Sequence, residues 1–183
     1  AVANRQLLSN NLGISDQLSC AILENGSVAC WGYNLYGQLG NSSSTSTFSS
    51  TPELTNPMPG NKLAVALDTS KYIGCALLEN GSVACWGWTW NYGEMGDGSQ
   101  SQGTRAPGLT GSFGTNRSAV EVSTANQGAC VLLDNGSVSC WGEGSKGTIG
   151  DGGTSHRFSP TPTASLPNGK KAVALTSGHT HHC

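Results

Sequence analysis

The sequence predicts an all-β fold built from repeated antiparallel hairpins, and two observations lead to this prediction. A 13-residue segment occurs three times, and its first cysteines, Cys20, Cys75 and Cys130, are 55 residues apart. A fixed period of this size is typical of solenoids, propellers and related arrays. Each copy also holds an Asn-Gly pair between two apolar runs, which is the strongest short-range signal for a β-hairpin. The copies read CAILENGSVACWG, CALLENGSVACWG and CVLLDNGSVSCWG.

The cysteines of the first copy decide between two possible turns. A two-residue turn at Asn25-Gly26 would place Cys20 and Cys30 on opposite faces of the ribbon. A three-residue turn, with Gly26 in the left-handed conformation that glycine adopts readily, places the two cysteines directly opposite each other. Opposed Cβ atoms lie about 4.5–5.5 Å apart, which suits a disulfide. We therefore predict one disulfide in each copy: Cys20–Cys30, Cys75–Cys85 and Cys130–Cys140.

In this register both faces of each hairpin are apolar. A ribbon that is apolar on both faces lies between two neighbouring layers, such as the blades of a propeller or the layers of a sheet stack. The tryptophan after the second cysteine ends each hairpin at an equivalent position. We therefore predict that these tryptophans are buried, one in each repeat: Trp31, Trp86 and Trp141.

Composition excludes several classes of function. Charged residues make up 11% of the 183 residues and the net charge is −2. A nucleic-acid partner would require clustered Lys and Arg, so none is expected. No apolar run approaches the roughly 18 residues of a membrane-spanning helix, and no membrane insertion is expected. Six of the seven cysteines form matched pairs, and their spacing does not suit zinc. Disulfides persist in oxidising compartments, so the predicted location is extracellular or at the cell surface.

The chain is predicted to be one repeat domain over residues 1–183. An N-terminal segment, residues 1–19, matches the repeat poorly. Hairpin repeats start near residues 20, 75 and 130, and a partial repeat covers residues 171–183. Between them lie polar segments, rich in Ser, Thr, Gly and Pro, that are predicted to be coil: residues 42–61, 99–116 and 153–169. Each leads into a short β run, namely Leu63–Leu67, Ser118–Val122 and Lys171–Leu175. No helix is predicted.

The repeated pattern resembles a known family. Ala-Val-x-Leu/Val, followed by Cys-Ala-Leu-Leu-x-x-Gly-x-Val-x-Cys-Trp-Gly and a later Gly-x-Leu-Gly, is similar to the regulator of chromosome condensation repeat in its cysteine-containing form. The resemblance covers roughly residues 12–183. It implies a β-propeller with blades of about four antiparallel strands. About three 55-residue repeats plus a partial fourth are present, so we expect an incomplete or assembled propeller.

The resemblance implies fold more firmly than function. The founding member of the family acts on a small nuclear GTPase and on chromatin, and other relatives are secreted binders, including a bacterial β-lactamase inhibitor. We expect a non-enzymatic extracellular or cell-surface module with a structural or assembly role, of which the subunit of a fibre is one form. The alternative is a secreted binding or inhibitor protein that presents propeller loops to a target protein or glycan. Cys183 stands where a further hairpin begins, so the expected partner is a second copy, head to tail, or further repeats of the same chain.

Alternating aromatic residues follow the second hairpin. If Trp86, Trp88, Trp90 and Tyr92 continued as a strand, they would share one face, and Trp88, Trp90 and Tyr92 could stack against a ligand such as a sugar. The alternative is that Trp86 belongs to the core and the other three cap an insertion in this repeat. The sequence leaves both interpretations open.

Other residues suggest chemistry only weakly. His179, His181, His182 and Cys183 could be read as a metal cluster, but the resemblance implies a simpler interpretation, because the family often has small or His residues before this cysteine. Asp97 and Asp151 precede glycine in turns, and the number of possible ligands is too low for Ca²⁺. No nucleophile–base pair recurs, so we expect no catalysis, no cofactor and no metal.

Five positions carry the N-glycosylation signal Asn-x-Ser. Three of them coincide with the hairpin turns, where Asn-Gly is already explained by the turn: Asn25, Asn80 and Asn135. The other two, Asn41 and Asn116, lie in polar segments and lack this structural explanation. All five are candidate glycosylation sites if the protein is secreted from a eukaryotic cell.

Overall fold

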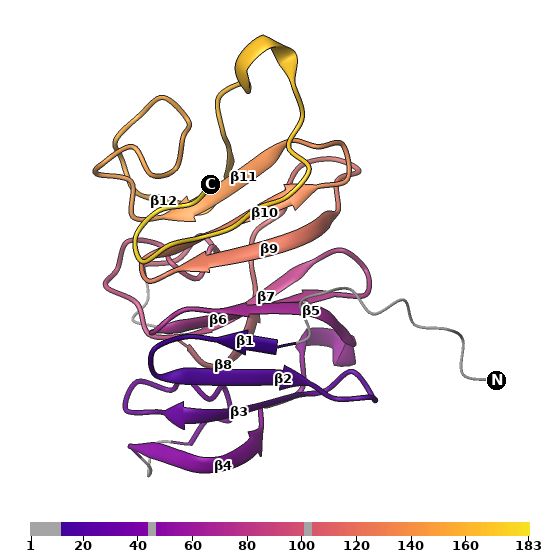
Figure 1. Cartoon of the computed structure of the whole chain (residues 1–183), viewed down its shortest axis with the longest axis vertical. Coiled ribbons are helices and arrows are strands. Elements are labelled where there is room, and N and C mark those ends of the chain that lie inside the picture. Colours follow the sequence, from indigo (N-terminus) through magenta and orange to yellow (C-terminus); the bar gives the residue numbers. More distant parts are fainter. Residues whose placement is uncertain (1–11, 44–46, 101–103) are drawn as a thin grey trace, which may run out of the picture.

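The computed structural model describes residues 12–43, 47–100 and 104–183. Within these ranges the chain forms three four-stranded antiparallel sheets, which confirms the all-β, blade-type prediction. The sheets follow one another along the long axis of the molecule (Figure 1). We refer to them as blades 1, 2 and 3. Their strands are β1 Leu12–Ile14, β2 Leu18–Ile22, β3 Val28–Tyr33 and β4 Phe48–Leu54 in blade 1; β5 Ala64–Thr69, β6 Ile73–Leu78, β7 Val83–Gly87 and β8 Thr104–Leu109 in blade 2; β9 Ala119–Ala125, β10 Gly128–Leu133, β11 Val138–Gly142 and β12 Arg157–Pro162 in blade 3.

The central hairpin of each blade has the predicted register. Cys20 lies opposite Cys30, and Ile22 lies opposite Val28. The N–H of Leu23 donates to the carbonyl oxygen of Ser27 at 2.8 Å, so the turn has three residues. Gly26 has φ 79°, the left-handed conformation that this turn requires. The equivalent cysteines are opposed in the other two hairpins, and all three predicted disulfides are present: Cys20–Cys30, Cys75–Cys85 and Cys130–Cys140.

The polar segments are not entirely coil, which corrects the sequence-based expectation. Each contains the outermost strand of its blade, β4, β8 or β12. Each of these strands holds a proline: Pro52, Pro107 or Pro160. Proline has no N–H for the ladder and is tolerated on an edge strand, where one side of the backbone has no partner. The segments also contain two short 3₁₀ turns, η1 Pro59–Asn61 and η2 Pro167–Gly169, and the described residues form no α-helix.

Lys171–Leu175 is not a strand of any sheet, although a β run was predicted there. The segment nevertheless lies along blade 3. The N–H of Ala172 donates to the carbonyl oxygen of Gly136 at 3.0 Å. The same bond occurs at 2.9 Å from Ala64 to Gly26, where blade 2 begins against blade 1. Lys171–Leu175 thus lies where the first strand of a blade would lie, but in the described residues it pairs with no other strand.

The hydrophobic core lies between the blades. The cluster between blades 1 and 2 includes Leu18, Val28 and Leu39 from blade 1 and Leu67 and Trp86 from blade 2. Blades 2 and 3 share a second cluster, in which Trp141 packs against Met95 and its neighbours. Both tryptophans are 0% exposed.

Trp31 is only half-buried, so the prediction of three equally buried tryptophans is wrong for this one. It belongs to blade 1, and in the described part of the chain no blade packs on that side.

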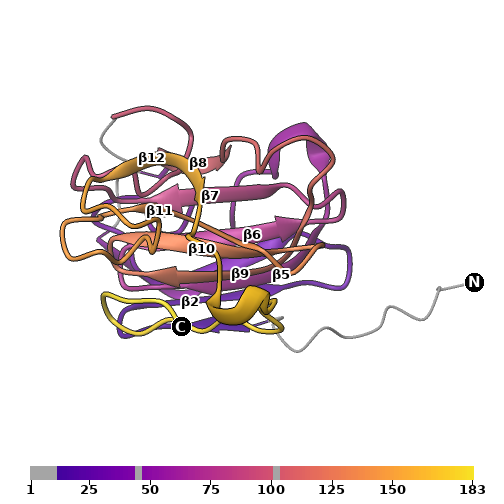
Figure 2. The same cartoon turned by 90° about the horizontal axis from the view of Figure 1, so that it is seen from above.

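The strands place their connections at two opposite edges of the molecule. β2 points toward one edge and β9 toward the other, as Figure 1 shows. The three Asn-Gly turns, after β2, β6 and β10, therefore lie at one edge, which we call the turn edge. The β5–β6 and β9–β10 turns, together with the loops after β3, β7 and β11, lie at the other. The view from above shows the sheets stacked with these loops at the two ends of the strands (Figure 2). No helix in the described residues has the length and apolar character needed to span a membrane.

Candidate functional site: an aromatic edge

A row of aromatic side chains lies at the edge opposite the Asn-Gly turns and crosses all three blades. We call it the aromatic edge. Between blades 1 and 2, the ring centroids of Tyr36 and Trp88 are 4.5 Å apart. Between blades 2 and 3, those of Tyr92 and His156 are also 4.5 Å apart. All members are partly exposed to solvent. They are Tyr33, Tyr36, Tyr72, Trp88, Trp90, Tyr92 and His156.

The aromatics after Trp86 do not share one face. β7 ends at Gly87, and the following residues form a loop rather than a continued strand. Trp88 contacts Tyr36 of blade 1, Trp90 packs edge-on against Tyr72 at 4.4 Å, and Tyr92 contacts His156 of blade 3. Trp86 points into the core, as the second of the two interpretations stated.

Glu94 shapes this loop from inside. Its carboxylate is 0% exposed and accepts hydrogen bonds from the backbone N–H groups of Trp90 and Tyr92, both at 2.9 Å. Burial raises the pKa of Glu94 above its ordinary value, while the two N–H bonds and His156 oppose that shift. One buried side chain thus fixes the backbone that carries two members of the aromatic edge.

Gln38 has the same role in blade 1. It is fully buried, and its Oε1 accepts a hydrogen bond from the backbone N–H of Tyr36 at 3.0 Å. Asn34, also buried, accepts from the N–H of Leu39 at 3.1 Å. Because these polar side chains hold the loop, the ring of Tyr36 is presented from a fixed backbone. Tyr33 extends the row, with its ring centroid 6.1 Å from that of Tyr36.

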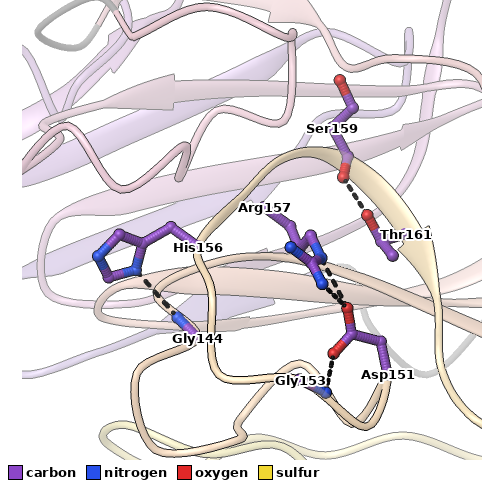
Figure 3. A network of polar contacts seen from close by, with 7 residues as sticks. All are labelled: Gly144, Asp151, Gly153, His156, Arg157, Ser159 and Thr161. Atoms are coloured by element: carbon purple, nitrogen blue, oxygen red, sulfur yellow. Dashed lines mark hydrogen bonds and ion pairs between the residues drawn. The ribbon is translucent and has the colours of Figure 1, made fainter.

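His156 is held by the third-blade loop (Figure 3). Its Nδ1 accepts a hydrogen bond from the N–H of Gly144 at 3.2 Å. Beside it, the carboxylate of Asp151 forms an ion pair with Arg157 and accepts from the N–H of Gly153 at 2.9 Å. The Gly153 bond and then Arg157 lower the pKa of Asp151. The Asp151 carboxylate thus closes the loop that positions His156.

The chemistry of the edge is aromatic rather than ionic. One cation lies over a ring of this edge: the Nζ of Lys71 is 5.2 Å from the centre of the Tyr72 ring. At this distance a cation is attracted by the face of an aromatic ring. In the described ranges no group of three His, Cys, Asp or Glu residues could hold a metal ion. Such an edge can offer apolar area and hydrogen-bonding groups to a partner.

The histidines near Cys183 contact different partners. The His179 ring contacts the Asn126 amide at 3.1 Å, whereas His182 Nδ1 is 2.6 Å from Ser177 Oγ. The His179 contact joins the C-terminal segment to blade 3, and the His182 contact lies within that segment.

The sequons occupy several environments. At Asn25, Asn80 and Asn135 on the turn edge, Oδ1 accepts the hydroxyl of the sequon serine at 2.7 Å. Asn116 is exposed with φ 55°, whereas the amide of Asn41 donates to Glu53 at 2.6 Å. Their use as glycosylation sites stays a prediction.

Sequence reasoning named Trp88, Trp90 and Tyr92 but missed the other members of the aromatic edge. Tyr33 and Tyr36 follow Trp31-Gly32 in the place where aromatic residues follow Trp86-Gly87, so an alignment of the repeats could have indicated them. Tyr72 and His156 gave no such signal, because tertiary contacts bring them into the row: Tyr72 contacts Trp90 within blade 2, and His156 of blade 3 contacts Tyr92 of blade 2.

Comparison with known proteins agrees with the repeat structure. The family model of the regulator of chromosome condensation (RCC1) repeat matches residues 13–38. The E3 ubiquitin-protein ligase HERC2 of Homo sapiens is 32% identical over 164 residues, which is 89% of this chain and 3% of that protein. The chain therefore spans a small part of this relative.

Solved structures show the same fold. Yeast RCC1 (Prp20), solved bound to Kap60, has a TM-score of 0.81 at 15% identity. The match covers 93% of this chain and 40% of the yeast RCC1 chain. The CRINKLY WD40 ectodomain of the Arabidopsis thaliana receptor kinase ACR4 has a TM-score of 0.58 at 19% identity. The match covers 94% of this chain and 49% of the ectodomain chain.

Proposed function

Because this chain is built of regulator of chromosome condensation repeats that fold as β-propeller blades, we propose that it is a non-enzymatic protein-binding module that acts outside the cell. We further propose that its partner binds at the aromatic edge.

One observation carries the proposal: partly exposed aromatic rings form a row across three blades, and the loops that hold them are fixed from inside. Tyr and Trp are enriched at the centres of protein interfaces, where they bury large areas at small entropic cost. Buried Gln38 and Glu94 hold the backbone of two of these loops, and Asp151 holds the third. An edge that is rigid before binding loses little conformational freedom when a partner docks.

The arrangement of the rings favours a protein over a glycan. A sugar-binding platform requires a ring face that is free to stack against a pyranose. Trp88 is stacked at a tilt on Tyr36, and Tyr92 on His156, so one face of each ring is already covered. Rings that expose mainly their edges can contact both apolar and polar groups, and they therefore suit a broad protein surface better than a sugar ring.

Three disulfides support a location outside the cell, because such bonds form and persist in oxidising compartments. The related solved structures include a receptor ectodomain and a propeller bound to another protein. If the protein passes through a eukaryotic secretory pathway, the exposed Asn25, Asn80 and Asn116 are the first candidates for glycosylation. The structural role expected from the sequence, including a fibre, stays a prediction.

The test uses the oxidised protein and two double variants. Tyr36→Ser/Trp88→Ser changes the aromatic edge, and Asn80→Ala/Asn135→Ala changes the turn edge as a matched control. Each is immobilised and exposed to extracellular protein from the source tissue or culture and, separately, to a glycan array. We expect one specific set of proteins to be retained by the wild type and the control and lost by the aromatic-edge variant. Equal retention by both variants, or binding to glycans alone, would overturn the proposal.

A further inference from the structure

The chain contains four Asn-Gly pairs, and they occur in two kinds of turn. Three form the hairpin turns, at Asn25, Asn80 and Asn135, and the fourth, Asn168-Gly169, lies in the 3₁₀ turn η2. Such a pair can react internally, because the backbone nitrogen of the glycine can attack the side-chain carbonyl carbon of the asparagine. Glycine has no Cβ atom to hinder this attack. The structure around each pair therefore determines which of the four reacts.

In the hairpin turns the asparagine side chain is held by hydrogen bonds. Oδ1 of Asn25 accepts a bond from the backbone N–H of Ser27 at 3.0 Å and another from its hydroxyl at 2.7 Å. The same two bonds occur at Asn80 and at Asn135. Ring closure requires the side chain to turn its carbonyl carbon onto the glycine nitrogen, so these bonds must first break, which costs free energy.

The glycine of each hairpin turn is also covered. The segment that follows the outermost strand of the same blade lies over it, and in blade 1 the N–H of Ala64 donates to the carbonyl oxygen of Gly26 at 2.9 Å. A Cβ atom added to these glycines would lie 2.7, 2.5 and 2.7 Å from a neighbour: Leu63 for Gly26, Ser118 for Gly81 and Lys171 for Gly136. This close packing opposes the backbone rearrangement that ring closure requires.

Asn168 lacks both restraints. It is exposed, and within the described ranges its side chain makes no hydrogen bond. A Cβ atom on Gly169 would have nothing within 4 Å. The N–H of Gly169 donates to the carbonyl oxygen of Leu166 at 3.1 Å, which is a bond inside the turn itself. Ring closure at this pair is therefore unobstructed by the rest of the fold.

The exposure of this turn does not depend on whether a blade follows it. The same turn, η1, lies between blades 1 and 2: Gly60 and Asn61 have φ 67° and 53°, and Asn168 and Gly169 have φ 58° and 65°. Gly60 and Asn61 are exposed although blade 2 packs against blade 1. In η1 the order of the two residues is reversed, so Asn61 precedes Lys62 instead of a glycine. The chain thus contains an exposed asparagine in the same turn without the reactive pair.

We propose that Asn168 is a site of spontaneous deamidation in the folded protein, and that the fold protects the three hairpin Asn-Gly pairs. The nitrogen of Gly169 attacks Cγ of Asn168, a C–N bond forms, the Cγ–Nδ2 bond breaks, and ammonia leaves with the proton that the nitrogen loses. Water then opens the resulting succinimide at either carbonyl and gives aspartate or isoaspartate. The product carries a carboxylate beside Lys170. This site is independent of the function proposed for the aromatic edge.

The experiment incubates the oxidised, unglycosylated protein at mildly alkaline pH and follows each asparagine by peptide mapping with mass spectrometry. Electron-transfer fragmentation separates aspartate from isoaspartate. Because a hairpin asparagine must first lose two hydrogen bonds, we expect Asn168 to react at least about tenfold faster than Asn25, Asn80 or Asn135. The same protein, reduced and unfolded in denaturant, is the control, and there all four Asn-Gly pairs should react at similar rates.

A double variant moves the reactive pair to the other turn. Gly60→Asn/Asn61→Gly gives η1 the residue order of η2, and both residue types tolerate the left-handed conformation. We expect the asparagine placed at position 60 to react at a rate similar to that of Asn168, whereas Asn61 of the wild type reacts far more slowly than Asn168. Equal rates at Asn168 and the hairpin asparagines of the folded protein would overturn the proposal. An equally large difference in the unfolded protein, or an unreactive asparagine at position 60, would also overturn it.

Discussion

The carboxylate of Asp68 in blade 2 accepts two hydrogen bonds from Thr124 in blade 3, from the backbone N–H at 2.7 Å and from the hydroxyl at 3.1 Å. The two residues are 56 positions apart in the chain. Thr124 is buried, so without Asp68 its polar groups would lack these partners in a site that excludes water. This contact connects two blades that otherwise meet mainly through apolar side chains.

Asp68→Ala should therefore lower the free energy of unfolding by roughly 1–3 kcal/mol, the cost of leaving buried donors unsatisfied. The measurement is chemical denaturation of the oxidised protein. Asp134→Ala is the control. The side chains of Asp134 and Arg117, which form an ion pair, are each about 40% exposed, so this substitution should change the free energy of unfolding by less than about 1 kcal/mol. Equal losses in the two variants would show that Asp68 does not connect the blades.

Substitution of the repeat tryptophans should separate them into two classes. Trp86→Ala and Trp141→Ala each remove a fully buried indole and should cost roughly 3–5 kcal/mol. Trp31→Ala should cost less, because its side chain is half-buried. Thermal unfolding of the three variants checks this order. A loss for Trp31→Ala as large as for the other two would contradict the packing described above.

The hairpins could be predicted from the sequence because their determinants are local. Gly26 allows the three-residue turn, and the opposed Cys20 and Cys30 fix the register. The fourth strands could not be predicted, because β4, β8 and β12 are polar edge strands that each contain a proline. Their hydrogen bonds, rather than their composition, make them strands.

The aromatic edge was only partly predictable for a different reason. The loop after β7 departs from a strand because buried Glu94 accepts two of its N–H groups, and a single alternating pattern cannot reveal that contact. The half-exposure of Trp31 depends on whether another blade covers it, which no local pattern reports. Contacts between repeats therefore limit what the sequence alone can predict.

Glu94 should make stability depend on pH. Its pKa in the folded protein is raised above the ordinary value by burial, so the folded state holds the proton more tightly than the unfolded state. The stabilisation is complete below the ordinary pKa of a glutamate, near 4.5, and is lost as the pH rises through the folded pKa. Unfolding measured across this range should show a downward slope that Glu94→Gln removes. Glu79→Gln, at an exposed position, should keep the slope, and a slope that persists in Glu94→Gln would refute the assignment.

His182 should respond in the opposite direction. Burial, and to a smaller extent His181, lower its pKa to about 4, so the folded segment prefers the neutral ring. This contribution is fully present above the ordinary pKa of 6.5 and is lost as the pH falls toward 4. We expect the amide of Cys183, which donates to Thr176 at 2.8 Å, to exchange faster with solvent over this interval. NMR titration of the His182 ring gives the independent check, and an ordinary pKa there would contradict the burial of the ring.

The central claim is that a protein partner binds the aromatic edge, and side-chain footprinting of the native complex tests it most directly. Hydroxyl radicals modify exposed Tyr and Trp side chains, so bound and free protein can be compared residue by residue. The account predicts protection of Tyr36, Trp88 and Tyr92 in the complex, with Leu63, next to the turn edge, equally reactive in both states. Protection of Leu63 with unchanged reactivity of the three aromatic residues would contradict it.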